Sequence, residues 1–153
     1  MMENNFEVLM DTIIHVSEVN ENLQDIIQDL SKRGISHDRT KFQDPEYSMF
    51  CSTRPEFKKA NFGTPEYEAV TKKAQVAVNH HYKHNRHHTG FHENGVKDMN
   101  LMDLLEMLAD WKAASRRSPD LTFEDSLPRA FKKYNMDEAL QQAIRNTIKY
   151  LEW

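Results

Sequence analysis

The chain has 153 residues, with 20 lysines and arginines against 24 aspartates and glutamates, which gives a formal net charge of −4. This length predicts one domain over residues 1–153, and the mild acidity argues against a protein dedicated to duplex nucleic acid, which usually carries a basic excess. The sequence has neither the roughly 18-residue apolar run of a membrane span nor the basic N-terminus of a signal peptide. Its single cysteine, Cys51, excludes an internal disulfide, so we expect a cytoplasmic protein outside the membrane.

The first predicted element is a helix over about residues 5–33. Seven apolar residues follow one another at alternating three- and four-residue steps on one side of this helix: Phe6, Leu9, Ile13, Val16, Leu23, Ile27 and Leu30. Asn20 interrupts this stripe, and His15 lies on its flank, where a structural role is the ordinary interpretation. Arg33 and Gly34 then provide a basic last turn and a glycine for a left-handed cap, so we expect the helix to end there.

The rest of the chain predicts further helices and little β-branched alternation. They span about residues 45–51, 64–82, 100–116, 122–133 and 137–151. The helix at 64–82 has the clearest start, because Thr64 can cap it and Pro65 suits its first turn. We predict an all-α bundle of about five or six helices, with the motif-bearing core at about 5–117 and covering helices at about 120–153.

Apolar residues at helical spacing predict which faces turn inward. The expected inward residues of the helix at 64–82 are Tyr67, Val70, Ala74 and Ala77, and those of the helix at 100–116 are Leu101, Leu104, Leu108 and Trp111. The expected packing residues of the last two helices are Phe123, Leu127, Phe131, Leu140, Ile144, Ile148 and Leu151.

Six of the eight histidines lie between His80 and His92. His81 continues the inward face of its helix by one more turn, so its imidazole is directed into the interior, where it needs a partner. A lone histidine in such a place is usually bonded to a backbone carbonyl. His80 beside it and His84 one turn further favour a cluster instead.

Outside this segment, two acidic positions stand out. Asp38 directly follows His37, and an imidazole next to a carboxylate is an efficient pair of ligands for a divalent metal. The surrounding HDRTKF is more informative, because it places Lys41 three residues after the carboxylate. On the helix at 100–116, Asp110 directly precedes Trp111 near the inward edge, and we favour a functional role for it.

The other two carboxylates of that helix are interpreted differently. Asp103 and Glu106 fit a solvated acidic face, with Lys112 as the counter-charge.

Six of these residues, taken in chain order, resemble the metal-binding series of the HD-domain superfamily: His15, His37, Asp38, His80, His81 and Asp110. The members of that superfamily are all-helical metal-dependent phosphohydrolases. HDRTKF is similar to that family's His-Asp-x-x-Lys motif, whose lysine helps to hold a phosphate. The double-histidine segment resembles the bimetallic branch that cleaves cyclic dinucleotides, but Tyr82 stands where that branch has a glutamate, so we do not transfer its substrate. A closer likeness, over about residues 14–117, is to an uncharacterised family of small bacterial and phage proteins; it includes HDRTKF, Glu46, NHHYKHNRHH and LMDLLEMLADWKAA.

The resemblance implies one or two divalent ions, and the donors do not choose among Mn, Fe, Co, Ni and Zn. One ion would be held by His15, His37, Asp38 and Asp110. A second would be held by His80 and His81 with His87 or His88, and Asp38 would bridge. Further ligands or orienting groups would be His84, Glu106 and Glu46, although Glu46 can equally be a helix-start carboxylate.

The resemblance implies that Asp38 and Lys41 are the catalytic pair, and that Lys41, Lys83 and Arg86 meet the substrate phosphate. The first hypothesis is thus a phosphohydrolase for a nucleotide or a similar small phosphate ester, acting through metal-activated water. The second is a di-iron oxygenase on the same scaffold, and the third is a non-catalytic metal-binding helical module. Related HD proteins often pair, which implies a homodimer; substrate and metal identity stay open.

Overall fold

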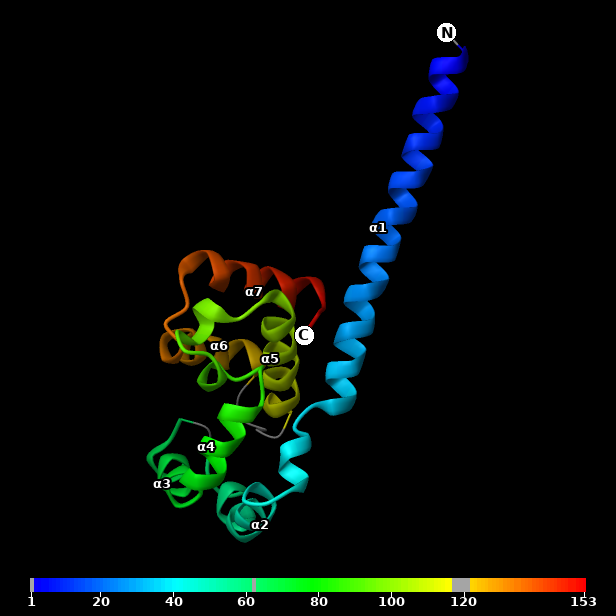
Figure 1. The fold of residues 1–153 in the computed structure, drawn as a ribbon. Coiled ribbons are helices and arrows are strands. Elements are labelled where there is room, and N and C mark those ends of the chain that lie inside the picture. Colours follow the sequence, from blue (N-terminus) through cyan, green and yellow to red (C-terminus); the bar gives the residue numbers. More distant parts are fainter. Residues whose placement is uncertain (1, 62, 117–121) are drawn as a thin grey trace. The chain divides into compact units, whose positions relative to one another are not determined.

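The computed structural model describes residues 2–61, 63–116 and 122–153, and for residues 2–5 only the backbone. The described part consists of seven α-helices and three short 3-10 helices without a strand, which confirms the all-α prediction (Figure 1). It divides into two compact units, residues 1–36 and 37–153. None of the described helices is long and apolar enough to cross a membrane. The predicted boundary between residues 117 and 120 falls outside the described residues.

Helix α1 (Met2–Ser36) makes up the first unit. It continues past Gly34, where the sequence predicted its end. Asp38, with φ of 56°, adopts the left-handed conformation in place of the glycine. The Ser36 hydroxyl meanwhile donates to backbone carbonyl oxygens one turn earlier, which satisfies the last turn of the helix. The predicted glycine cap is therefore wrong.

Helix α2 (Glu46–Phe57) follows the short η1 (Arg39–Phe42) and begins directly after Pro45, as predicted. It runs beyond its predicted end at residue 51 and contains Pro55 in its last turn, where the missing N–H removes one helical hydrogen bond. Glu46 stands in the first turn, where the helix dipole favours a carboxylate, and its side chain is completely buried.

Two helices, α3 (Pro65–Lys73) and α4 (Gln75–His84), occupy the segment predicted as one. The predicted start is confirmed, since the Thr64 side chain accepts from the N–H of Tyr67. The single helix is wrong, because Ala74 has ψ of 14° and interrupts the helical geometry. The inward stripe nevertheless continues across the break, and its buried members are Val70, Ala74, Ala77 and His81.

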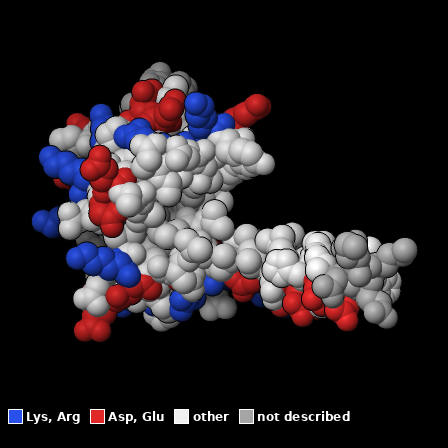
Figure 2. Space-filling model, turned by 90° about the horizontal axis from the view of Figure 1, so that it is seen from above, with Lys and Arg blue, Asp and Glu red and all other residues white. Residues whose placement is uncertain are grey.

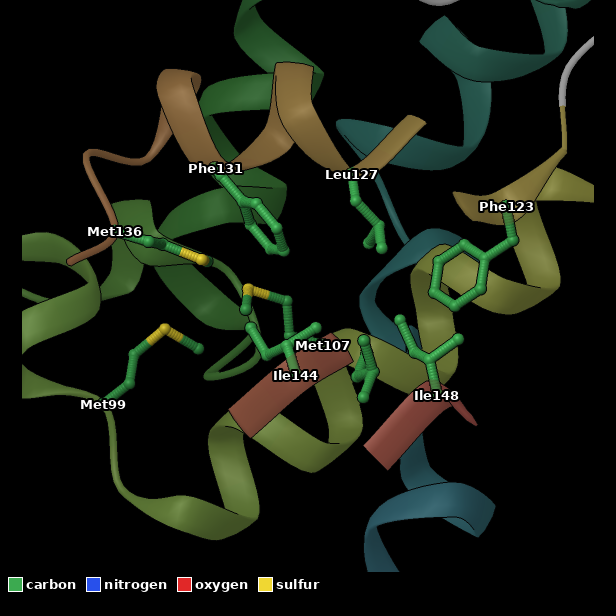
Figure 3. Packing of buried hydrophobic residues seen from close by; sticks show 9 residues of the cluster. Met99, Met107, Phe123, Leu127, Phe131, Met136, Ile144 and Ile148 are labelled. Carbon is green, nitrogen blue, oxygen red and sulfur yellow. The ribbon is translucent and has the colours of Figure 1, made fainter. Parts of the chain in front are cut away.

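The apolar core lies among α5 (Leu101–Ser115), α6 (Phe123–Lys133) and α7 (Glu138–Tyr150). Its buried residues, drawn in Figure 3, are Met99, Met107, Leu108, Phe123, Leu127, Phe131, Met136, Ile144 and Ile148. Leu104, Trp111 and Leu140 are partly buried against them, so most of the predicted inward residues are confirmed. Leu101 and Leu151 are exposed instead, because each lies at a helix end that the buried cluster does not reach.

Candidate metal centre

The unit of residues 37–153 brings histidines and carboxylates together from four segments. These are the two residues before η1, the first turn of α2, the end of α4 with the loop behind it, and the middle of α5. Helix α2 packs against both α4 and η1, which brings the first three segments together. The left-handed Asp38 turns the chain into η1 and thereby places its carboxylate beside α4.

The inner group consists of Asp38, His81, His87 and His88, each offering one donor atom, and all four donor atoms lie within 4.8 Å of one another. His81 Nε2 is 3.1 Å from Asp38 Oδ1 and 2.8 Å from His88 Nε2. His87 Nε2 is 3.5 Å from the same oxygen of Asp38. Two nitrogens that bind one ion at about 2.1 Å lie about 3 Å apart when they meet at right angles, so these spacings suit ligands of one cation.

A second group, His37, His87 and Asp110, meets the same distance criterion. His37 Nε2 lies 3.6 Å from Asp110 Oδ1 and 3.5 Å from Asp38 Oδ2. His87 Nε2 cannot serve both groups, because one imidazole nitrogen binds one ion. Asp38 can serve both, because Oδ1 faces the inner group and Oδ2 faces His37. The arrangement therefore offers donors for one four-ligand site, or for two sites that share Asp38.

Two carboxylates hold the imidazole rings from the outer side. Glu46 accepts from Nδ1 of His80 and of His81 at 2.7 and 2.8 Å. Glu106 Oε1 lies 3.0 Å from His37 Nδ1 and 3.2 Å from His87 Nδ1. Because an ionised carboxylate only accepts, the facing Nδ1 carries the proton, and in a neutral ring Nε2 then keeps its lone pair. Metal-ligating histidines are almost always held in this way.

Two buried atoms at this centre have no hydrogen-bond partner among the described residues, namely Asp38 Oδ1 and His87 Nε2. A buried polar atom without a partner costs about 1–3 kcal/mol. Both atoms belong to the inner group, so one cation bound there would satisfy both. Imidazole together with carboxylate suits divalent transition metals. The residues present therefore fit such an ion.

Two of the inner donors, Asp38 and His88, are in the protonation states that ligate metals. Burial alone would raise the pKa of Asp38, but the close contact with the imidazole of His81 and the ammonium of Lys41 outweigh it and hold this pKa well below the usual range. Burial lowers the pKa of His88 to about 3, and His87 acts in the same direction. At neutral pH the aspartate is therefore an anion and His88 is a neutral imidazole.

His37 is in a different state. The carboxylates of Asp110 and Glu106 raise its pKa to about 10. Burial raises the pKa of Asp110, but the contact with His37 outweighs this and lowers it. Without a metal ion, His37 is thus a cation at neutral pH between two carboxylates.

Three predicted ligands belong to neither donor group of the described residues. His15 is on α1, in the other unit. His80 is bonded to Glu46 and stacks on His84 with ring centroids 4.0 Å apart. His84 is exposed and donates from Nδ1 to the carbonyl oxygen of His80. Within the described residues, neither donor group includes any of these three.

The three predicted phosphate-binding cations have different surroundings. Lys41 pairs with Asp38, and its side chain is 43% exposed. Lys83 is exposed on α4. Arg86 makes a two-pronged pair with the carboxylate of Asp103, at 3.0 and 2.9 Å, so a protein anion already engages its guanidinium.

The interpretation of Asp103 as part of a solvated face is wrong, because this residue is completely buried. Its carboxylate also accepts from the backbone N–H of Asn100, while the Asn100 side chain accepts from the N–H of Asp103. This capping box starts α5. The spacing of the two residues was a signal that could have revealed the role of Asp103.

Other roles had weaker signals in the sequence. His87 and His88 were predicted only as additional ligands, because helical periodicity ends with α4 and cannot follow the loop behind it. Asn85 and Thr40 were not singled out at all. The Asn85 amide donates to the Thr40 hydroxyl and to the carbonyl oxygen of His81, both at 2.8 Å, which ties η1 to the end of α4.

The model of a family of unknown function, DUF5662, matches residues 4–151. The chain belongs to DUF5662. The match spans both units, so α1 is part of what defines a DUF5662 protein. No curated protein and no solved structure matches the chain. Because the DUF5662 description names no activity, the function of this member has to be argued from its site.

Proposed function

We propose that this DUF5662 protein is a metal-dependent phosphohydrolase of the HD type, acting on a nucleotide or a related small phosphate ester. The observation that carries the proposal is the convergence of Asp38 with three imidazoles. Two of their buried donor atoms, Asp38 Oδ1 and His87 Nε2, lack hydrogen-bond partners among the described residues. Asp38, His81, His87 and His88 would hold one ion. His37 and Asp110 would hold a second one together with the other oxygen of Asp38.

Divalent ions of this kind lower the pKa of a bound water to about 7 and polarise a phosphoryl oxygen. The chain's own groups orient and balance this chemistry. Glu46 and Glu106 keep the protons on the outer ring nitrogens, which fixes both the tautomer and the angle of each ring. Lys41 is half-exposed beside Asp38, so its ammonium can turn to a phosphate oxygen that enters.

The negative charge of the centre implies that metal ions bind before phosphate does. Asp38, Glu46, Glu106 and Asp110 surround the imidazoles within a small volume. A phosphate dianion next to these carboxylates would be repelled unless cations balance them. We therefore expect inorganic phosphate to bind the metal-loaded protein and not the metal-free one, which a titration with each form would measure.

The decisive experiment combines elemental analysis with turnover. The untagged protein is reconstituted with Mn, Fe(II), Co, Ni or Zn, and phosphate release is measured on nucleoside monophosphates first. We expect at least about one ion per chain, because four donors converge. Asp38→Asn should lose both the metal and the activity, since it removes the charged ligand of the inner group, whose second oxygen also faces His37.

Glu66→Gln is the matched control, because Glu66 is an exposed carboxylate in the first turn of α3. It should keep metal and turnover. Two irons per chain with oxygen consumption and without phosphate release would instead identify an oxygenase. Bound metal without any turnover would identify a binding module, and either result would overturn the proposal.

A further inference from the structure

Helix α1 carries a heptad repeat that the metal centre does not use. With Phe6 at position a, the a positions of four consecutive heptads are Phe6, Ile13, Asn20 and Ile27. The d positions are Leu9, Val16, Leu23 and Leu30. All of them except Asn20 are apolar. Four heptads with apolar a and d positions are enough to indicate a coiled coil, and we call these eight positions the seam.

The seam is largely uncovered in the described structure. Ile13 is 53% exposed, Leu23 51% and Ile27 56%. Burying one such side chain contributes about 1.5–3 kcal/mol. Most helices in proteins owe their stability to the packing of an apolar face, so a 35-residue helix with this seam is expected to have a partner.

The charges of α1 identify the kind of partner. Between Phe6 and Leu30 the acidic residues are Glu7, Asp11, Glu18, Glu21, Asp25 and Asp29, and every one falls at position b, c or f. In Figure 2 the acidic side chains of α1 run along one edge of the helix, beside uncharged ones. A second copy packed on the seam would therefore bring no carboxylates together. A basic partner helix would gain little there, because the acids point away from the contact.

The residue types at the seam determine the number and direction of the strands. Isoleucine at a with leucine at d favours two parallel helices, and one asparagine at an a position specifies that state and its register. In a parallel pair, Asn20 faces Asn20 of the second copy, and the two amides can hydrogen-bond. In an antiparallel pair, a positions face d positions, so the Asn20 amide would be buried against an apolar side chain.

We propose that α1 forms a parallel two-stranded coiled coil with α1 of a second copy of this chain, along the seam from Phe6 to Leu30. The proposal does not rest on the phosphohydrolase activity. His15 stands at a c position, outside the seam. The dimer thus joins two chains through their first unit, while each second unit keeps its own group of metal donors.

The first experiment measures the mass of the full-length protein by sedimentation equilibrium between about 5 and 200 μM. The expected mass is twice the 18.1 kDa of the chain. The double variant Ile13→Asp, Leu23→Asp should halve this mass, because its dimer would have to bury four charges in the seam. Glu18→Lys, at an f position, should leave the mass unchanged. An unchanged near-ultraviolet circular dichroism signal from the stacked Trp111 and Tyr134 would show that the second unit of each variant is folded.

The second experiment tests the direction of the helices in a Cys51→Ser background. Leu9→Cys at a d position should form a disulfide-linked dimer on air oxidation, since position 9 faces position 9 only in a parallel pair. Asp11→Cys at an f position should not. The Asn20→Leu variant should dimerise more tightly and should also form higher oligomers. A monomer at every concentration, a dimer that survives the double aspartate variant, or no Leu9→Cys cross-link would overturn the proposal.

Discussion

The unit of residues 37–153 has two interiors of opposite chemistry. One is the apolar core of α5, α6 and α7, where nine buried side chains have no charged member (Figure 3). The other is the cluster of imidazoles and carboxylates, in which Glu46, His81 and His87 are almost completely buried. Apolar burial stabilises a fold in proportion to area, whereas buried polar groups cost free energy unless each one has a partner.

Helix α5 joins the two interiors. Met107 and Leu108 belong to the apolar core, while Glu106 and Asp110 reach the imidazoles from a neighbouring stripe of the same helix. The apolar side thus fixes the position of the helix, and this position brings Glu106 and Asp110 to the imidazoles. The first interior maintains the fold, and the proposed function assigns the chemistry to the second, so substitutions in each should separate the two roles.

The largest expected effect is on the apolar interior. Leu127→Ala should lower the free energy of unfolding by about 2–5 kcal/mol, because Leu127 is completely buried and its loss leaves a cavity. Denaturant unfolding of the metal-free protein measures this change. Metal bound per folded chain should not change.

Leu101→Ala is the control of the same residue type. Leu101 is 71% exposed, so its replacement should change the free energy of unfolding by less than about 0.5 kcal/mol. Equal losses in the two variants would contradict the location of the core.

The next effect is on the polar interior. Glu106→Gln should weaken metal binding by about 10- to 100-fold, because a neutral amide oxygen holds the ring protons of His37 and His87 less firmly than a carboxylate. Competition with a chromophoric chelator measures the affinity. Glu93→Gln, at an exposed loop position, is the control and should bind as the unchanged protein does. An unchanged affinity in Glu106→Gln would show that this carboxylate does not orient the ligands.

The apolar interior was more predictable from the sequence than the polar one. A helical period of 3.6 residues fixes which side chains share a face, so the burial of Leu127 and Ile148 and the inward direction of His81 followed from spacing alone. Capping chemistry is equally local, and it placed the start of α3 at Thr64. The break at Ala74 had no such signal, since alanine is the best helix former.

The polar interior depends on chain reversals that no period describes. His87 and His88 reach the centre because the chain turns back after α4, and one carboxylate orients two imidazoles from different segments. These are tertiary contacts between residues far apart in sequence. Residue types predicted which chemistry is present, but only the fold shows that Glu106 holds two rings from outside.

The last comparison distinguishes the two interiors by pH. His37 has a pKa of about 10 in the metal-free fold, raised from 6.5 by Asp110 and Glu106. A raised pKa contributes stability that is fully present below pH 6.5 and is lost as the pH rises through about 10. The metal-free protein should therefore lose stability between about pH 7 and 10. The apolar core does not titrate, so it adds nothing to this loss.

The same proton of His37 should make metal affinity depend on pH in the opposite direction from stability. A ligating imidazole must be neutral, so binding at pH 7 releases the proton of His37, and affinity rises with pH by up to about tenfold per unit. Calorimetric titration in buffers of different ionisation enthalpy counts the protons released. His37→Ala should release one fewer, whereas His84→Ala, which removes an exposed ring outside both donor groups, should release the same number as the unchanged protein. An equal count in His37→Ala would mean that His37 does not give up its proton to the metal, which would leave Asp38 and Asp110 without an imidazole at the second position.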